Sequence, residues 1–224
     1  MNNAPFNKIL IGFAFSPNLK ANVFEAMRLA DFLNAHLYFL HVGSKSPAKA
    51  KTFTEILEES PVQPQHLSVL WEEGEPVETI NEQCKKNKID LLLLGAMQRE
   101  NMLKFYMGSI ARKLTRNAPC SVLLMIKPSV IRKASQHVVV NAFESPETEN
   151  TVRSAFHFAQ ALGASKLTLV EEINRSEVAE EADDDRGLRK VTLRKEKLKR
   201  RELSRVREIL SRISDSLKEN IKIH

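Results

Sequence analysis

Residues 88–127 carry the sequence KIDLLLLGAMQRENMLKFYMGSIARKLTRNAPCSVLLMIK. The unbroken leucine run Leu91–Leu94 is typical of a strand covered on both faces, as in a parallel sheet. Gly95 ends this run, and a loop follows it. The next helix begins near Ser109, whose hydroxyl can accept a hydrogen bond from a free backbone N–H. Residues 121–126 form a second apolar strand, so the stretch predicts a strand–loop–helix–strand unit.

Strand and helix patterns alternate through the preceding residues in the same way. Apolar positions at helical spacing follow the Ser16-Pro17 turn, where Ser16 can cap the helix and Pro17 is tolerated in the first turn. A loop with a short helix fills residues 43–65. Alternating strands and helices imply a parallel sheet with right-handed crossovers. The expected strands are 8–15, 37–42 and 67–71, and the expected long helices are 16–34 and 77–87.

Here the sequence resembles the universal stress protein family. The family's nucleotide motif is a glycine after a strand, two residues, a glycine, nine residues, and Gly-Ser or Gly-Thr. In this chain Gly95, the nine-residue gap and Gly108-Ser109 match, while the middle glycine is Gln98. The family commonly has Gly-x-Pro before the third helix, and Gly74-Glu75-Pro76 matches it. The helix after Ser109 and the strand APCSVLLM are also similar to the family.

The resemblance implies an α/β fold of the universal stress protein type. It is Rossmann-like, with an open, mostly parallel five-stranded sheet and helices on both faces. The third strand lies at one edge of the sheet and the fifth at the other. Residues 1–128 are expected to form this domain.

The chain then repeats itself. Residues 137–164 align without gaps on residues 8–35, so that Ser145-Pro146 falls on Ser16-Pro17. We therefore expect a partial second unit of the same fold over residues 135–224, with a charged insert and a long helix carrying an apolar stripe from Leu203 to Leu217. Its third strand begins near Ile221. Either the sequence is cut short or the second unit is incomplete, and a partner or missing residues should cover the open sheet.

Ligands of open parallel sheets bind beyond the carboxyl ends of the strands, where the strand order reverses. Glycines allow close backbone approach to phosphate, and a helix N-terminus offers free N–H groups. The resemblance implies an adenine-nucleotide site for ATP or AMP with magnesium. Its residues would be Ala14, Ser16, Val42, Gly95, Gln98, Gly108 and Ser109.

Two positions depart from the nucleotide-binding pattern. Nucleotide-binding members usually carry Asp where this chain has Ala14, and the second unit has Phe143 at the matching place. Gln98 replaces a glycine that keeps the loop thin. Two interpretations stay open: a nucleotide site, or a structural loop followed by an ordinary helix cap. The two departures favour the structural loop.

No catalytic residue can be assigned, because the sequence has no nucleophile elbow, Walker motif or paired carboxylates. His41 has no second His, Cys or acidic residue at metal-ligand spacing, so we expect a hydrogen-bonded core or edge histidine. Cys84 and Cys120 are the only cysteines and are expected to be reduced, buried or half-buried thiols.

The net charge is +6 and the pI is about 9.3, but the charged residues are unevenly distributed along the chain. Residues 171–185 are acidic, whereas residues 186–201 are strongly basic. A basic run can neutralise the phosphates of a nucleic acid or another polyanion. However, no aromatic residue lies between Lys166 and His224 to stack on bases. A solvated charged helix or linker is therefore favoured over contact with a polyanion or a membrane surface.

The sequence predicts a cytoplasmic, non-catalytic stress-response or signalling module that acts by association. The association would pair the two units or two chains, or involve an unknown protein partner. No apolar run approaches the roughly 20 residues of a membrane span, and the first residues lack a secretory signal. The alternatives are an adenine-nucleotide binding protein whose ligand controls assembly, with weak ATPase activity, and a polyanion-binding factor using residues 186–201.

Overall fold

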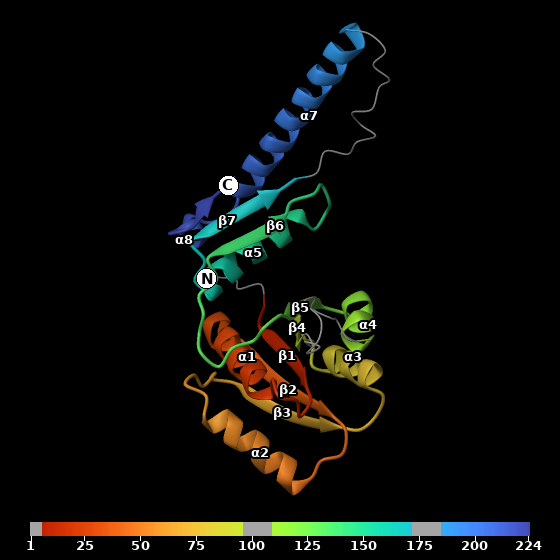
Figure 1. The fold of residues 1–224 in the computed structure, drawn as a ribbon, viewed down its shortest axis with the longest axis vertical. Coiled ribbons are helices and arrows are strands. Elements are labelled where there is room, and N and C mark those ends of the chain that lie inside the picture. Colours follow the sequence, from red (N-terminus) through yellow and green to blue (C-terminus); the bar gives the residue numbers. More distant parts are fainter. Residues whose placement is uncertain (1–5, 96–108, 172–184) are drawn as a thin grey trace. The chain divides into compact units, whose positions relative to one another are not determined.

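The computed structural model describes residues 6–95, 109–171 and 185–224. The chain divides into two compact units, Met1–Lys133 and Ala134–His224. Each unit has a parallel β-sheet of its own (Figure 1). The units are described separately below.

The first unit is built on a five-stranded parallel sheet with the order β3-β2-β1-β4-β5. This order confirms the α/β class and places the third and fifth strands at the two edges, as the family resemblance implied. The strands are β1 (Lys8–Phe13), β2 (His36–Val42), β3 (Leu67–Glu72), β4 (Leu91–Gly95) and β5 (Ser121–Met125). Strand β1 ends two residues earlier than expected, before Ala14.

Helices cover both faces of this sheet, with α1 and α2 on one side and α3 and α4 on the other (Figure 1). The α3–α4 side buries Leu10 and Leu92 of the sheet together with Ile80 and Leu114 of the helices. The leucine run of β4 is buried on both faces because helices lie over each of them. The helices are α1 (Leu19–Leu33), α2 (Pro47–Glu58), α3 (Pro76–Lys86) and α4 (Ser109–Asn117).

The turn before α3 shows why Gly74-Glu75-Pro76 starts a helix. Gly74 has φ +143°, a conformation that residues with a side chain rarely adopt. The Glu75 carboxylate accepts a hydrogen bond of 3.0 Å from the Val77 amide, and Pro76 has the φ that a first helical turn needs. The chain therefore turns sharply out of β3 and enters α3 with its first amide satisfied.

The second unit has a three-stranded parallel sheet with the order β6-β7-β8. The strands are β6 (His137–Asn141), β7 (Lys166–Val170) and β8 (Lys222–Ile223), and the helices are α5 (Thr148–Leu162), α7 (Asp185–Ser211) and α8 (Asp215–Lys218). The expectation of a single helix that reaches Leu217 is wrong. The chain leaves the helix at Ser211 and starts α8 after the extended residue Ser214.

Among the residues that the structure describes, helices cover one face of this small sheet. Phe156 of α5, Leu167 of β7 and Ile209 of α7 belong to one apolar core. On the opposite face, Val139 is 60% exposed and Val170 is 44% exposed. The first half of α7 extends beyond the sheet of its own unit (Figure 1).

Candidate functional site

The carboxyl end of β1 is an exposed turn. Ala14, Phe15 and Ser16 follow Phe13, and all three are exposed. The Ser16 amide donates to the Ala14 carbonyl at 2.8 Å, and the Leu19 amide donates to the Ser16 carbonyl at 3.0 Å. The expected helix cap by the Ser16 side chain is therefore wrong. Because of these turns the helix begins only at Leu19. Asn18 is its N-cap residue, and its side chain makes no capping hydrogen bond.

Gly95 lies at the same end of the sheet as Ala14, because β1 and β4 are parallel neighbours paired through Ile11 and Leu93. A Cβ atom at Gly95 would lie 2.9 Å from the Nδ2 atom of Asn22 on α1. A side chain at this position would therefore displace the Asn22 amide group. The buried Oδ1 atom of Asn22 has no hydrogen-bond partner within the described part of the chain, so the site contains an unsatisfied acceptor.

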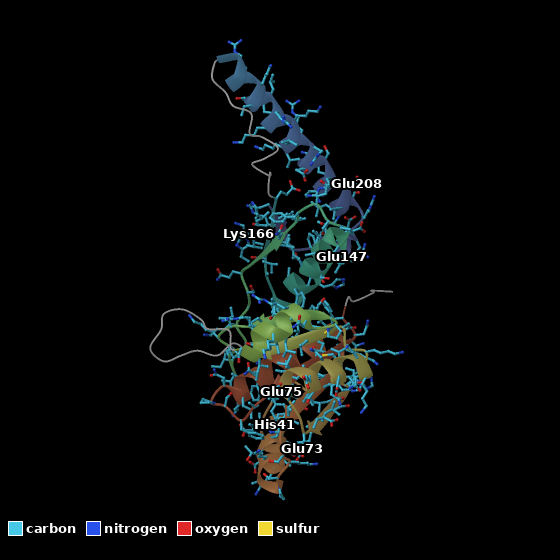
Figure 2. The ribbon with its side chains drawn as sticks, turned by 90° about the vertical axis from the view of Figure 1, so that its right-hand side faces the viewer. His41, Glu73, Glu75, Glu147, Lys166 and Glu208 are labelled. Atoms are coloured by element: carbon cyan, nitrogen blue, oxygen red, sulfur yellow. The ribbon has the colours of Figure 1, made fainter. Side chains whose placement is uncertain are left out.

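Val42 ends β2 at this edge, and its side chain is half-buried. The next amide, that of Gly43, donates to the Glu72 carbonyl at 2.7 Å, which holds the β2 end against β3. His41, labelled in Figure 2, is buried, and its Nδ1 atom lies 3.1 Å from the Phe13 carbonyl oxygen. The expectation of a hydrogen-bonded core histidine is confirmed.

An aromatic cluster lies beside these strand ends, and the sequence analysis did not identify it. Phe13, His41 and Trp71 face one another in register across β1, β2 and β3. Phe13 stacks on Phe53 of α2 with ring centroids 4.1 Å apart. The exposed ring of Phe15 lies 6.2 Å from that of Trp71. In the sequence, each of three successive strands carries an aromatic ring near its last residue, but which rings meet depends on how the strands align.

Two lysines lie near the outer rings of this cluster. The Lys45 Nζ atom is 6.0 Å from the centroid of Trp71, and the Lys49 Nζ atom is 5.9 Å from that of Phe15. Cations over aromatic faces are attracted by the ring quadrupole. The end of the sheet that the resemblance assigned to a nucleotide therefore carries aromatic rings and cations, with Ala14 in place of a carboxylate.

The remaining predicted site residues are only partly described. Gln98 and Gly108 lie outside the described residues. Ser109 is the first residue of α4 and is exposed. The structure thus brings Ala14, Val42 and Gly95 to the same end of the sheet, at the carboxyl ends of β1, β2 and β4.

In the second unit, a side chain of α7 lies against the carboxyl ends of β6 and β7. The Arg205 guanidinium donates to the Ala142 carbonyl at 2.6 Å and to the Glu171 carboxylate at 3.1 Å. It also bonds Glu202, which is only 7% exposed. Burial alone would raise the pKa of Glu202, but hydrogen bonds from Arg205 and Arg201 outweigh burial and lower it. This ion cluster lies at the carboxyl ends of β6 and β7.

The basic run of α7 faces solvent. From Arg189 to Arg201 every described Lys and Arg side chain is exposed, which agrees with a solvated charged helix. Among the described residues, no group of three His, Cys, Asp or Glu side chains could hold a metal ion. None of the helices in the described ranges is long and apolar enough to cross a membrane.

Comparison with known proteins decides the family. The family model described as "Universal stress protein family" matches residues 5–125. The chain belongs to the universal stress protein family. The matched range ends with strand β5, so the family model covers the five-stranded sheet of the first unit.

Individual universal stress proteins are similar to parts of the chain. Universal stress protein MJ0531 of Methanocaldococcus jannaschii is 36% identical over 56 residues, which is 25% of this chain and 33% of that protein. The chain therefore aligns with only a third of that relative. The structure of UspA from Lactobacillus plantarum covers 55% of this chain and all of its own, with 24% identity and a TM-score of 0.43. A universal stress protein in complex with cAMP covers 54% of this chain and 97% of its own, with 22% identity and a TM-score of 0.42.

Proposed function

We propose that this universal stress protein is a non-catalytic stress-response module that acts by pairing with a second copy of itself through strand β6. The observation that carries the proposal is the uncharged, uncovered edge of the second unit. Val139 at the centre of β6 is 60% exposed. Within the described residues, no strand pairs with the outer side of β6.

The second unit is a partial copy of the first, and comparison of the two explains the uncovered surface. Helices α1 and α5 both end at a residue in the left-handed conformation, Asn34 and Gly163. The repeat places Val139 at the position of Leu10, which is fully buried in a cluster with Ile80 of α3. In the second unit, none of the described helices takes the place of α3 on that face. Val139 and Val170 therefore form an apolar strip that solvent reaches.

Edge strands usually carry charges that oppose pairing with another chain. Strand β3 has Glu72 and strand β8 has Lys222, whereas the edge strands β5, with the sequence SVLLM, and β6, with the sequence HVVVN, have neither Asp, Glu, Lys nor Arg. A second copy presents the same edge. Antiparallel pairing centred on Val139 sets this residue against its own copy and His137 against Asn141, so no like charges meet. Two copies of the strip formed by Val139 and Val170 would then join.

The proposal is tested by the mass of the full chain in solution, measured by light scattering over a range of concentrations. We expect a dimer that Val139→Lys weakens by about tenfold or more, since two like charges would lie directly opposite each other across the pair. Leu193→Lys is the matched control, because Leu193 is 65% exposed on α7, and it should leave the dimer unchanged. A wild-type chain that stays monomeric would contradict association. A dimer weakened only by Ile126→Lys, next to β5, would show that the other edge is used.

Adenine-nucleotide binding by the first unit is a second candidate function. The observation that favours it is the buried Oδ1 atom of Asn22 beside Gly95, which has no hydrogen-bond partner among the described residues, because a sugar hydroxyl or other donor can bond to that acceptor. Ser109, at the start of α4, would offer its hydroxyl and free amides to phosphate. The chain lacks the carboxylate that nucleotide-binding members carry at the position of Ala14.

Thermal unfolding with ATP and magnesium tests this candidate. A ligand that binds only the folded state raises the melting temperature as its concentration passes the Kd. We expect Ala14→Asp, at an exposed position, to increase the shift because it restores the missing acceptor, and Ser109→Ala to decrease it. Asp31→Ala, at an exposed position on α1, should leave the shift unchanged. No shift in either the wild type or Ala14→Asp would reject the candidate.

A further inference from the structure

The half of α7 that extends beyond its own sheet carries a dense positive charge. Residues 189–201 contain eight Lys or Arg residues and a single carboxylate, that of Glu196. None of them belongs to the apolar core of the second unit. The packing of this unit therefore does not account for so many cations on one segment of helix.

Most of these cations lack a counter-charge. Arg201 pairs with Glu144 and Glu202. Six others are exposed and form no ion pair with any carboxylate in the part of the chain that the structure describes: Arg189, Lys190, Lys195, Lys197, Lys199 and Arg200. Like charges four residues apart, such as Lys195 and Lys199, destabilise a helix. An anionic partner would remove this repulsion.

Helical spacing places four of the lysines on two opposite sides of α7. With 3.6 residues per turn, Lys190 and Lys197 fall on one side of the helix. Lys195 and Lys199 fall on the other side, about 170° around the axis from the first pair. The helix can therefore present two cations to each of two separate rows of anions.

The two remaining sides of this segment differ from each other. Arg189 and Arg200 lie between the two lysine pairs, on the same side as Glu196. Val191 and Leu198 lie on the opposite side and are half-buried. Cations thus occupy three sides of the helix, and the fourth is apolar.

A groove fits this distribution better than a flat surface, because a flat surface contacts one side of a helix only. The major groove of duplex DNA is about 12 Å wide, admits an α-helix and has a phosphate strand on each side. A helix on a membrane surface needs an exposed apolar face. In residues 189–201, the one large apolar side chain that is more than half exposed is Leu193, which has Lys190 and Lys197 as its neighbours at helical spacing.

We propose that residues 189–201 of α7 bind the major groove of duplex DNA through its phosphates. Lys190 and Lys197 contact one strand, and Lys195 and Lys199 contact the other. Single-stranded DNA is a poorer ligand, because residues 166–224 contain no Phe, Trp or Tyr on which bases could stack. The major groove of duplex RNA is too narrow for side chains to read. This surface is independent of strand β6 and of the strand ends of the first unit.

The test measures the affinity of the full chain for a fluorescent DNA duplex of about 20 base pairs by anisotropy, at salt concentrations from about 50 to about 200 mM. Four phosphate contacts predict a slope of about −3.6 for the logarithm of the association constant against that of the salt concentration. The affinity should therefore fall by about a hundredfold over this range. No binding at the lowest salt concentration, or an affinity that does not change with salt, would overturn the proposal.

Two double variants test the two sides of the helix. Lys190→Gln with Lys197→Gln, and Lys195→Gln with Lys199→Gln, should each make the slope shallower by about 1.8, since each removes two contacts. Glutamine keeps the helix propensity of lysine. Lys85→Gln with Lys86→Gln is the matched control, because it removes two exposed charges at the end of α3, and it should leave the slope unchanged. An equal effect of the control would mean that net charge alone, and not α7, attracts the DNA.

Alternative partners are distinguished with the same chain. A single strand of equal length should bind at least tenfold more weakly than the duplex, and so should vesicles that contain phosphatidylserine. Tighter binding to the vesicles, equal binding of the single strand, or an effect of only one of the two lysine pairs would contradict the groove. The wild-type affinities for duplex, single strand and vesicles decide the outcome even if a variant does not fold.

Discussion

At the scale of single residues, His157 makes the stability of the second unit depend on pH. It lies on α5 and is 7% exposed. Burial, and then the charge of Arg153, lowers its pKa below the ordinary value. An unfolded histidine takes up a proton near pH 6.5, whereas the folded one stays neutral to lower pH. Its contribution to stability is therefore complete above about pH 6.5 and is lost as the pH falls below that value.

We expect His157→Gln to reduce this acid sensitivity, because glutamine does not titrate. The measurement is the free energy of unfolding in urea at about pH 7.5 and about pH 5.5, on either side of the histidine pKa. The decrease in the free energy of unfolding from the higher to the lower pH should be smaller for the variant than for the wild type. The same loss in both chains would mean that His157 stays unprotonated in the unfolded chain or is protonated in the folded one.

Single residues are also where the sequence prediction was least complete. Ser16 has the chemistry of a helix cap, but its backbone is used in a turn, and a turn of this kind leaves no mark in the residue types. The register-matched rings of Phe13, His41 and Trp71 depend on how three strands align. Residue spacing along one strand does not contain that alignment, so the cluster became visible only in the folded sheet.

At the scale of secondary structure, Arg205 anchors α7 to the ends of β6 and β7. Its side chain is 20% exposed, and its guanidinium contacts Ala142, Glu171 and Glu202. We expect Arg205→Ala to lower the stability of the second unit by about 1–3 kcal/mol, since it leaves the buried Glu202 and the Ala142 carbonyl with fewer donors. Amide hydrogen exchange of β6 and β7 should rise accordingly.

Arg200→Ala is the matched control for this prediction. Arg200 lies on the same helix and its side chain is exposed, so its removal should change stability by less than about 0.5 kcal/mol. Equal effects of the two substitutions would mean that the ion cluster contributes nothing beyond an exposed arginine.

The elements themselves were largely predictable, because apolar periodicity and turn residues mark them. The expected second-unit strand near Ile221 is the observed β8. The leucine run before Gly95 is β4. The end of α7 at Ser211 was not predictable, because its apolar stripe continues through Ile213 and Leu217 into α8. A stripe at helical spacing does not show that a helix is interrupted.

At the scale of the molecule, the two units have separate cores and should respond separately to core substitutions. Leu37 in β2 and Leu167 in β7 occupy the same register position of their sheets, and both are 0% exposed. We expect either substitution by alanine to lower the free energy of unfolding of its own unit by about 2–5 kcal/mol. Leu167→Ala should raise hydrogen exchange in residues 137–170, and Leu37→Ala should raise it in residues 8–42.

Each of these variants is the control for the other. The exchange rates of the unsubstituted unit should remain those of the wild type. A change spread over both units in either variant would show that the chain unfolds as one cooperative body, and the description as two stable units would then be wrong.

The ring cluster at the strand ends also gives the molecule an optical asymmetry. Trp71 is the only tryptophan, and both tyrosines, Tyr38 and Tyr106, precede residue 133. The second unit therefore absorbs and emits almost nothing above the phenylalanine band. Tryptophan emission follows the first unit alone, whereas far-ultraviolet dichroism follows the helices of both. Recorded on one sample, the two signals separate the unfolding of the units without any attached label.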